Sequence, residues 1–333
     1  MSRFVKTGKG PVRRPNATII TGRPGIGKTY LASEIPGVFW IPVEQGLSGA
    51  NPERLEEIQR FKNDDGSDAQ PQTLGEFLEM LQAIPAVKEP HIKHVVVDST
   101  TGLEKLVNKQ ACKQESVLHM EAKEFKKVWS ATAPMWERIR KELDILRDKH
   151  GLHVWVIAHA QEITETASNG EIFSKWDIRF DGSGAVLGSI REGWRTWADH
   201  VLFIDWDSVV TPGKVMAKKA VGKYNARVLR TRETPQHFAK NRASLPPILP
   251  ATWRDLAAAF AAASPASEAK LREQIAAVAG SLGTEEQKAI KADMETAKTT
   301  QALSAVLSRA QGMLSVAKEE ETEAQESAPE ETA

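Results

Sequence analysis

The segment GRPGIGKT, residues 22 to 29, carries the most specific chemical pattern in this sequence. It fits G-x-x-x-x-G-K-[ST], in which glycines let backbone N–H groups turn inward around phosphate oxygens. We expect Lys28 to contact the β- and γ-phosphates of ATP and the Thr29 hydroxyl to hold Mg²⁺. The alternative, a glycine-rich turn without nucleotide, does not account for the β-rich run before the motif and the helical run after it. The predicted nucleotide site comprises Gly22, Arg23, Pro24, Gly25, Ile26, Gly27, Lys28, Thr29 and Tyr30.

Three polar residues stand at the ends of apolar runs and are candidates for the chemistry around the phosphates. Asp98 ends HVVVD, on a strand expected beside that of the motif, and could bind Mg²⁺-bound water; alternatively it begins the next helix. Glu44 follows VFWIPV and could activate water as a general base, or it is an exposed loop acid. His159 ends VWVIAH and could hydrogen-bond the γ-phosphate, although a histidine at a strand end is by itself more often structural.

Lys240 and Arg242 are a further pair with two interpretations. They lie two residues apart on an extended segment, so their side chains point the same way. They could stabilise transition-state charge, in cis or across a subunit interface. The alternative is a solvated basic strand.

Two segments could contact nucleic acid. Residues 160 to 190 include Lys175, Trp176, Arg179 and Phe180, which could stack on bases and grip a backbone, but five acidic residues there leave this role open. The second segment could neutralise phosphates, because residues 214 to 242 contain one acid, Glu233, and these bases: Lys214, Lys218, Lys219, Lys223, Arg227, Arg230, Arg232, Lys240 and Arg242.

The runs that position these residues alternate between strand and helix. Near-continuous apolar strands are predicted at 17–21, 38–43 (ending near Ile41 because of Pro42), 94–98, 153–159 and 200–204. Helices are predicted at 74–84 and 125–151, the latter with a core-facing stripe from Trp129 to Leu146. A Pro-Gly turn after residue 211 predicts a hairpin at the sheet edge, and LPPILPATW predicts an extended strap. The alternation predicts an α/β fold with a mainly parallel sheet flanked by helices.

Composition sets the domain boundaries and excludes several classes of protein. We expect a basic arm at 1–16, a core at 17–263, a helical appendage at 264–316 and a disordered acidic tail at 317–333. No apolar run approaches the roughly 20 residues of a membrane span, and the N-terminus lacks the apolar stretch of a secretory signal. The single cysteine, Cys112, excludes an internal disulfide framework and favours the cytoplasm. Two His-x-x-His pairs lack a third ligand, so Mg²⁺ is the metal we expect.

From about Ala17 to Pro246 the series of motifs resembles the RecA-type ATPase core. The series contains GRPGIGKT, a strand ending in Glu44, VVVDS, VIAH, the segment GSGAVLGSIREGW and the basic KNR at 240–242. The resemblance implies a RecA-like sheet with antiparallel edge strands, Glu44 as catalytic glutamate and His159 as γ-phosphate sensor. It also implies that Lys240 and Arg242 are fingers that reach a neighbour's nucleotide in a homo-oligomer.

The chain is also similar to phage and prophage RecA-like ATP-binding proteins linked to single-strand annealing and recombination. That similarity implies DNA-stimulated ATP hydrolysis on single-stranded DNA, in the host cytoplasm if the gene is a phage gene. A different class of function stays open: an ATP-switched binding or loading module with slow hydrolysis, which recruits a protein partner through its C-terminal helices or acidic tail.

Overall fold

The computed structural model describes residues 14–44, 47–87, 89, 91–120, 125–167, 169–181, 184–211, 221–297 and 300–326. The chain divides into two compact units. The first comprises Met1–Asn241 with Pro247–Trp253, and the second comprises Arg242–Pro246 with Arg254–Ala333. The division therefore falls about ten residues before the boundary expected at residue 264. The expected basic arm lies mostly outside the described residues.

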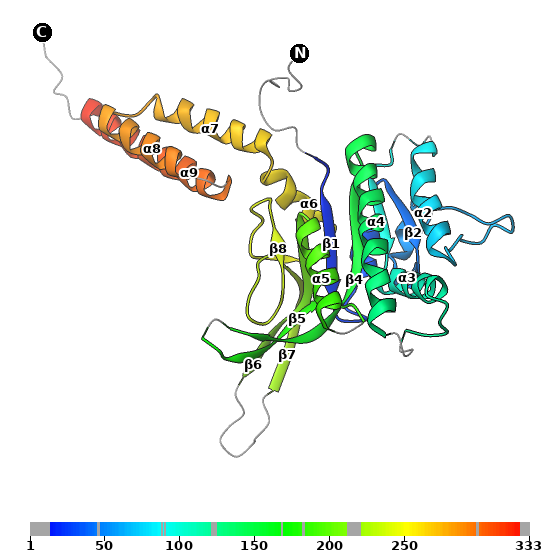
Figure 1. The fold of residues 1–333 in the computed structure, drawn as a ribbon. Helices are drawn as coiled ribbons and strands as arrows, with labels where there is room; N and C mark the ends of the chain where they lie inside the picture. Colours follow the sequence, from blue (N-terminus) through cyan, green and yellow to red (C-terminus); the bar gives the residue numbers. More distant parts are fainter. Residues whose placement is uncertain are drawn as a thin grey trace, which may run out of the picture. The chain divides into compact units, whose positions relative to one another are not determined.

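In the described residues, a sheet of nine strands forms the centre of the first unit (Figure 1). Its main path runs β2-β3-β4-β1-β6-β7-β9, and β5 and β8 pair with β4 and β6. The strands are β1 Ala17–Gly22, β2 Val38–Pro42, β3 His94–Asp98, β4 His153–Thr166, β5 Ile172–Ile178, β6 His200–Thr211, β7 Val221–Arg230, β8 Lys240–Asn241 and β9 Ile248–Pro250. The first five strands of the path are parallel and the others pair antiparallel. The predicted α/β fold with antiparallel edge strands is confirmed.

The strand order corrects one expectation, because β4 lies between β1 and β3. Gly22 at the end of β1 pairs with His159 on β4, and Asp98 at the end of β3 pairs with Ile157 on the same strand. The strand of Asp98 is therefore not the immediate neighbour of the strand that leads into the P-loop. Gly22, Asp98 and His159 still lie at nearly the same level of the sheet, where β1 and β3 end.

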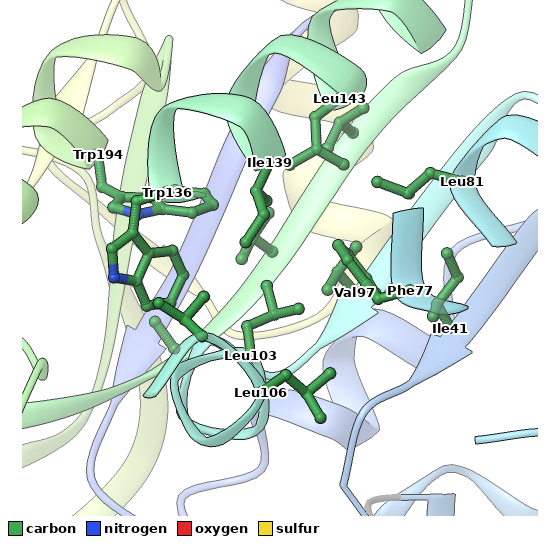
Figure 2. Close-up of a cluster of buried hydrophobic side chains, with 14 of the residues drawn as sticks. Ile41, Phe77, Leu81, Val97, Leu103, Leu106, Trp136, Ile139, Leu143 and Trp194 are labelled. Carbon is green, nitrogen blue, oxygen red and sulfur yellow. The ribbon is translucent and has the colours of Figure 1, made fainter. Parts of the chain in front are cut away.

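Helices cover the sheet and provide its apolar core. In the first unit they are α1 Lys28–Ser33, α2 Leu74–Ala83, α3 Thr100–Gln114, α4 Phe125–His150 and α5 Gly184–Trp197, with short 3₁₀ turns at Leu47–Gly49, Pro52–Arg54 and Ile84–Ala86. Figure 2 shows Leu103 and Leu106 of α3, Trp136, Ile139 and Leu143 of α4 and Trp194 of α5 gathered in one cluster. The predicted stripe on α4 is buried, as expected for a core face. Packing in this core holds α3 in place against the sheet, and α3 begins two residues after Asp98.

Two antiparallel ribbons extend the sheet beyond its parallel part. β4 continues past His159 to Thr166 and pairs with β5, and β6 continues past Ile204 and pairs with β7. The predicted hairpin after residue 204 is thus confirmed as a pairing of strands, while its Pro-Gly turn lies outside the described residues. The first candidate nucleic-acid segment, residues 160–190, consists largely of β4, β5 and α5.

The second unit is helical. Its helices are α6 Trp253–Ala262, whose first residue still belongs to the first unit, α7 Pro265–Ala279, α8 Thr284–Thr296 and α9 Thr300–Glu326. Ile275, Ile290 and Leu303 bring α7, α8 and α9 into one small core. Because α9 continues to Glu326, the segment 317–326 is helical where a disordered tail was expected; residues 327–333 are not described. None of the described helices has the length and apolar character required to cross a membrane.

Candidate functional site

The P-loop connects β1 to α1 in a conformation that its glycines permit. Gly25 and Gly27 have φ angles of 73° and 100°, in the left-handed region that side chains disfavour. Gly27 is also the residue before α1, so the chain turns there from the loop into the helix. The strand, loop and helix predicted around the motif are therefore all present, and the loop leaves the edge of the sheet at which the parallel strands end.

Lys28 is held inside this loop and is only 5% exposed. Its ammonium donates to the carbonyl oxygens of Gly22 and Arg23 at 3.0 and 2.9 Å, and lies 3.3 Å from Nδ1 of His159. Burial lowers the pKa of Lys28 to about 8, against the opposing attraction of Asp98 and Glu44. The positively charged ammonium of Lys28 thus lies inside the loop, where a P-loop binds phosphate.

Asp98 and Thr29 meet beside the lysine. The Thr29 hydroxyl donates to Oδ2 of Asp98 at 3.2 Å, and Asp98 is only 4% exposed. Burial and the nearby charge of Glu44 raise the pKa of Asp98 to about 6, while Thr29 and Lys28 oppose the shift. A hydroxyl and a buried carboxylate are oxygen ligands of the kind that Mg²⁺ accepts together with water and phosphate oxygens. These two residues therefore fit the metal role.

Glu44 follows the end of β2 and lies next to Asp98. The backbone N–H groups of Val43 and Glu44 donate to the carbonyl of Asp98 at 2.7 and 3.1 Å. The Ser99 hydroxyl donates to one oxygen of the Glu44 carboxylate at 2.7 Å, and the Lys105 ammonium lies 3.4 Å from the other. The carboxylate is thus oriented by two donors and remains partly exposed, as a base that must reach water requires.

His159 links the lysine to the ribbon of β4 and β5. An ammonium can only donate, so Nδ1 of His159 accepts from Lys28, and a neutral ring then carries its proton on Nε2. Burial and the charge of Lys28 lower the pKa of His159, which keeps the ring neutral at pH 7. Its backbone carbonyl accepts from the Arg179 N–H at 2.8 Å. His159 can therefore donate to a phosphate oxygen and is connected directly to the end of β5.

Lys240 lies at the opposite edge of the sheet. It pairs with Val201 near the start of β6, whereas the P-loop lies at the level of Ile204. Its ammonium donates to the carbonyl oxygens of Arg195 and Thr196, at 2.8 and 3.1 Å, in the last turn of α5. Lys240 is therefore out of reach of its own P-loop. Arg242 belongs to the second unit.

The candidate nucleic-acid residues of 160–190 are largely committed to the fold. Phe180 is 1% exposed and packs edge-on against Trp136 in the core, so it cannot stack on bases. Lys175 is buried and pairs with Glu165 at 3.1 Å and with Glu233. Arg179 pairs with Asp181 at 3.1 Å. Lys175 and Phe180 are therefore corrected from candidate nucleic-acid contacts to structural residues, whereas the partly exposed Arg179 stays a candidate.

Trp176, the fourth residue of that set, is half-buried, and the guanidinium of Arg23 lies 4.6 Å from the centre of its ring. A cation at that distance over an indole face is a favourable contact. Trp176 thus contacts the P-loop from β5, and no local pattern in the sequence indicates this pairing.

Several residues at or near the site are not indicated by any motif in the sequence. Ser99 and Lys105 orient Glu44, and only the adjacency of Ser99 to Asp98 could have indicated one of them. Glu104 is buried on α3 and accepts the Asp181 N–H at 2.7 Å; burial, with the charge of Asp181, raises its pKa to about 8. Arg227 lies against the P-loop although about two hundred residues separate them in sequence, which no local pattern reveals.

Comparison with known proteins adds a family assignment. Residues 14–243, more than half of the chain, match the family described as AAA domain. Among solved structures, the chain is similar to the crystal structure of the RadB recombinase at 16% identity and a TM-score of 0.35, over 68% of this chain and 91% of that one. A likeness at that score bears on neither function nor the details of the site. No curated protein matches the sequence.

Proposed function

Because this chain belongs to the AAA domain family of P-loop ATPases, we propose that it hydrolyses ATP with Mg²⁺ and couples turnover to single-stranded DNA. The observation that carries the proposal is the convergence of one ammonium, two carboxylates and one neutral imidazole at a single edge of the sheet. Lys28 comes from the P-loop, Asp98 and Glu44 come from the ends of β3 and β2, and His159 comes from the middle of β4. A nucleotide-binding loop used only for structure would not need a positioned base.

Each residue has a part in the proposed hydrolysis. Lys28 neutralises the β- and γ-phosphates, and Thr29 and Asp98 hold Mg²⁺, which when bound offsets the charge that develops on the phosphates. Glu44 accepts a proton from the water that attacks the γ-phosphorus, and Ser99 and Lys105 keep its carboxylate oriented. His159 donates from Nε2 to a γ-phosphate oxygen.

The coupling to DNA rests on charge and on the ribbon of β6 and β7. Between these two strands in sequence lie Lys214, Lys218 and Lys219, and no acidic residue occurs from 208 to 232. Such a segment could neutralise the phosphates of a single strand. The series of RecA-like motifs supports the same role, in recombination or strand annealing of the phage type.

Assembly into a homo-oligomer is part of the proposal. Lys240 cannot reach the P-loop of its own chain, so a finger role for Lys240 requires a neighbouring subunit. Such a role would also require Lys240 to leave the carbonyl groups at the end of α5. Arg242 is the better candidate, because the planar guanidinium can bridge two oxygens of the γ-phosphate.

A second candidate is an ATP-switched module that recruits a protein partner and hydrolyses slowly. It is favoured by the ion pairs of Lys175 and the burial of Phe180, which commit two of the four candidate DNA contacts of the segment 160–190 to the fold. The helical second unit, which has its own apolar core, could then carry the partner site.

Measuring ATP hydrolysis with and without single-stranded DNA at one fixed salt concentration separates the two candidates. The first predicts that DNA raises the rate, and that the stimulation falls as salt rises because phosphate contacts are screened. The second predicts the same slow rate in both conditions. Lys28→Ala, purified in parallel, controls for contaminating ATPases.

A further inference from the structure

Arg227 approaches the P-loop from the ribbon of β6 and β7. Arg227 on β7 pairs with Trp206 on β6. Trp206 lies two positions beyond Ile204, and Ile204 pairs with Gly22 on β1. From there the side chain reaches back over the loop, and Nη1 donates to the carbonyl of Ile26 at 3.4 Å. A Cβ atom at Gly27 would run into the same guanidinium. The two strands thus place an arginine directly against the second half of the P-loop.

The same guanidinium lies over an aromatic ring of α1. Its central carbon is 5.5 Å from the centre of the Tyr30 ring, within the range of a cation–π contact. Tyr30 directly follows Thr29, the predicted Mg²⁺ ligand. Both residues are half-buried, so neither is closed off from a ligand at the loop.

Arg227 has no carboxylate partner among the described residues, unlike several other arginines of the first unit. Arg60 pairs with Asp68, and Arg195 pairs with the buried Asp177. The weak contact of Arg227 with the carbonyl of Ile26 leaves most of the five N–H donors of its guanidinium unused by that bond. A planar fork of this kind matches two phosphate oxygens at once.

The order of the strands indicates which part of the nucleotide Arg227 would meet. Glu44, Asp98 and His159 all come from strands on one side of β1, in the order β2, β3, β4. The γ-phosphate must face that side, because the base acts there. The α-phosphate and nucleoside then extend toward the other side of β1, where β6 and β7 bring Arg227.

We infer that Arg227 is a nucleotide-binding residue that acts in cis on the α-phosphate side of the bound nucleotide, opposite Lys28. This inference rests on the proposed ATPase function and deepens it. Because ADP and ATP share the α-phosphate and nucleoside, Arg227 binds both and does not distinguish them. Its place on β7 also connects nucleotide occupancy directly to the ribbon that carries the basic segment.

The test compares the affinities of Mg²⁺-ADP and of a non-hydrolysable ATP analogue by calorimetry, in the full chain and its variants. Arg227→Ala should raise both dissociation constants by about 10- to 100-fold, the usual value of a hydrogen bond to a charged group. Arg227→Gln keeps a donor for the Ile26 carbonyl but loses the charge, so it should also weaken the binding of both nucleotides. Arg60→Ala is the matched control, because Arg60 also donates to backbone carbonyls but lies beyond β2.

Two results would overturn the inference. Parental affinity for both nucleotides, in either Arg227 variant that folds as judged by circular dichroism, would remove Arg227 from the site. A loss confined to the ATP analogue would move it to the γ-phosphate. A parent chain that binds no nucleotide would instead contradict the proposed function, so the two failures are distinguishable.

Discussion

Gly102 offers a sharp test of how tightly Glu44 is positioned. It lies in the first turn of α3, and a Cβ atom there would be 2.8 Å from Cγ of Glu44 and 2.9 Å from the carbonyl oxygen of Val43. Ordinary contacts of a Cβ begin at 3.4 Å, so Gly102→Ala requires a shift of about 0.6 Å. The N–H of Val43 is bonded to Asp98, which resists movement of that backbone. The Glu44 side chain or α3 must therefore move.

The expected size of the effect follows from this overlap. Alanine favours a helix over glycine by about 1 kcal/mol, whereas overpacking costs about 1–3 kcal/mol, so the net loss in stability is about 0–2 kcal/mol. A misplacement of about 1 Å in a catalytic group costs about 100-fold in rate, so about 0.6 Å predicts roughly a 10-fold fall in kcat. The P-loop is untouched, and the affinity for ATP should not change.

The assay is steady-state hydrolysis at saturating ATP, with nucleotide affinity and thermal unfolding measured on the same samples. Gly188→Ala on α5 is the matched control, because a Cβ there meets no atom within 4 Å. That variant should gain up to about 1 kcal/mol in stability and keep the parental kcat. If Gly102→Ala hydrolyses ATP as fast as the parent, Glu44 is not held against α3 in the working enzyme and the reasoning is wrong.

Three further predictions concern the other residues of the site. Lys28→Ala should keep the fold and lose nucleotide binding, as measured by calorimetry and circular dichroism; hydrolysis at the parental rate would contradict it. Because burial raises the pKa of Asp98 from 3.8 to about 6, its contribution to the stability of the Mg²⁺-free protein is present below pH 4 and lost as pH rises to 6, by about 3 kcal/mol. Denaturant unfolding should show this loss in the parent and not in Asp98→Asn, and identical pH profiles would refute it. Mixing Lys28→Ala with Arg242→Ala should restore part of the ATPase activity if Arg242 serves a neighbour's site; no recovery at any ratio would rule that role out.

The residues near one another in sequence were predictable. The P-loop is a local pattern, and the apolar runs gave the five parallel strands because strands buried on both faces need continuous apolar residues. The sheet brings Asp98 and Glu44 together as the strand ends indicated, and the Asp98 carboxylate lies at the Thr29 hydroxyl. Whether Glu44 acts as the base stays a prediction.

The other contacts of the site join segments that lie far apart in the sequence, and a single sequence does not reveal which segments meet. Phe180 could stack on a base or fill the core, and only the packing of α4 against the end of β5 selects the core. Lys175 is a surface cation by type, but Glu165 and Glu233 come from different segments to pair with it. Arg227 meets the P-loop because β7 continues the sheet two strands away from β1. The position of β4 between β1 and β3 is likewise a matter of strand order.

Single-turnover hydrolysis by Glu44→Gln tests the central claim most directly. The substitution keeps the size and polarity of the side chain and removes the base, so Mg²⁺-ATP should bind with parental affinity. Cleavage of the bound ATP should then slow by about 100-fold or more relative to the parent chain. An unchanged rate of cleavage would contradict the account, because Glu44 would then be a structural acid held by Ser99 and Lys105.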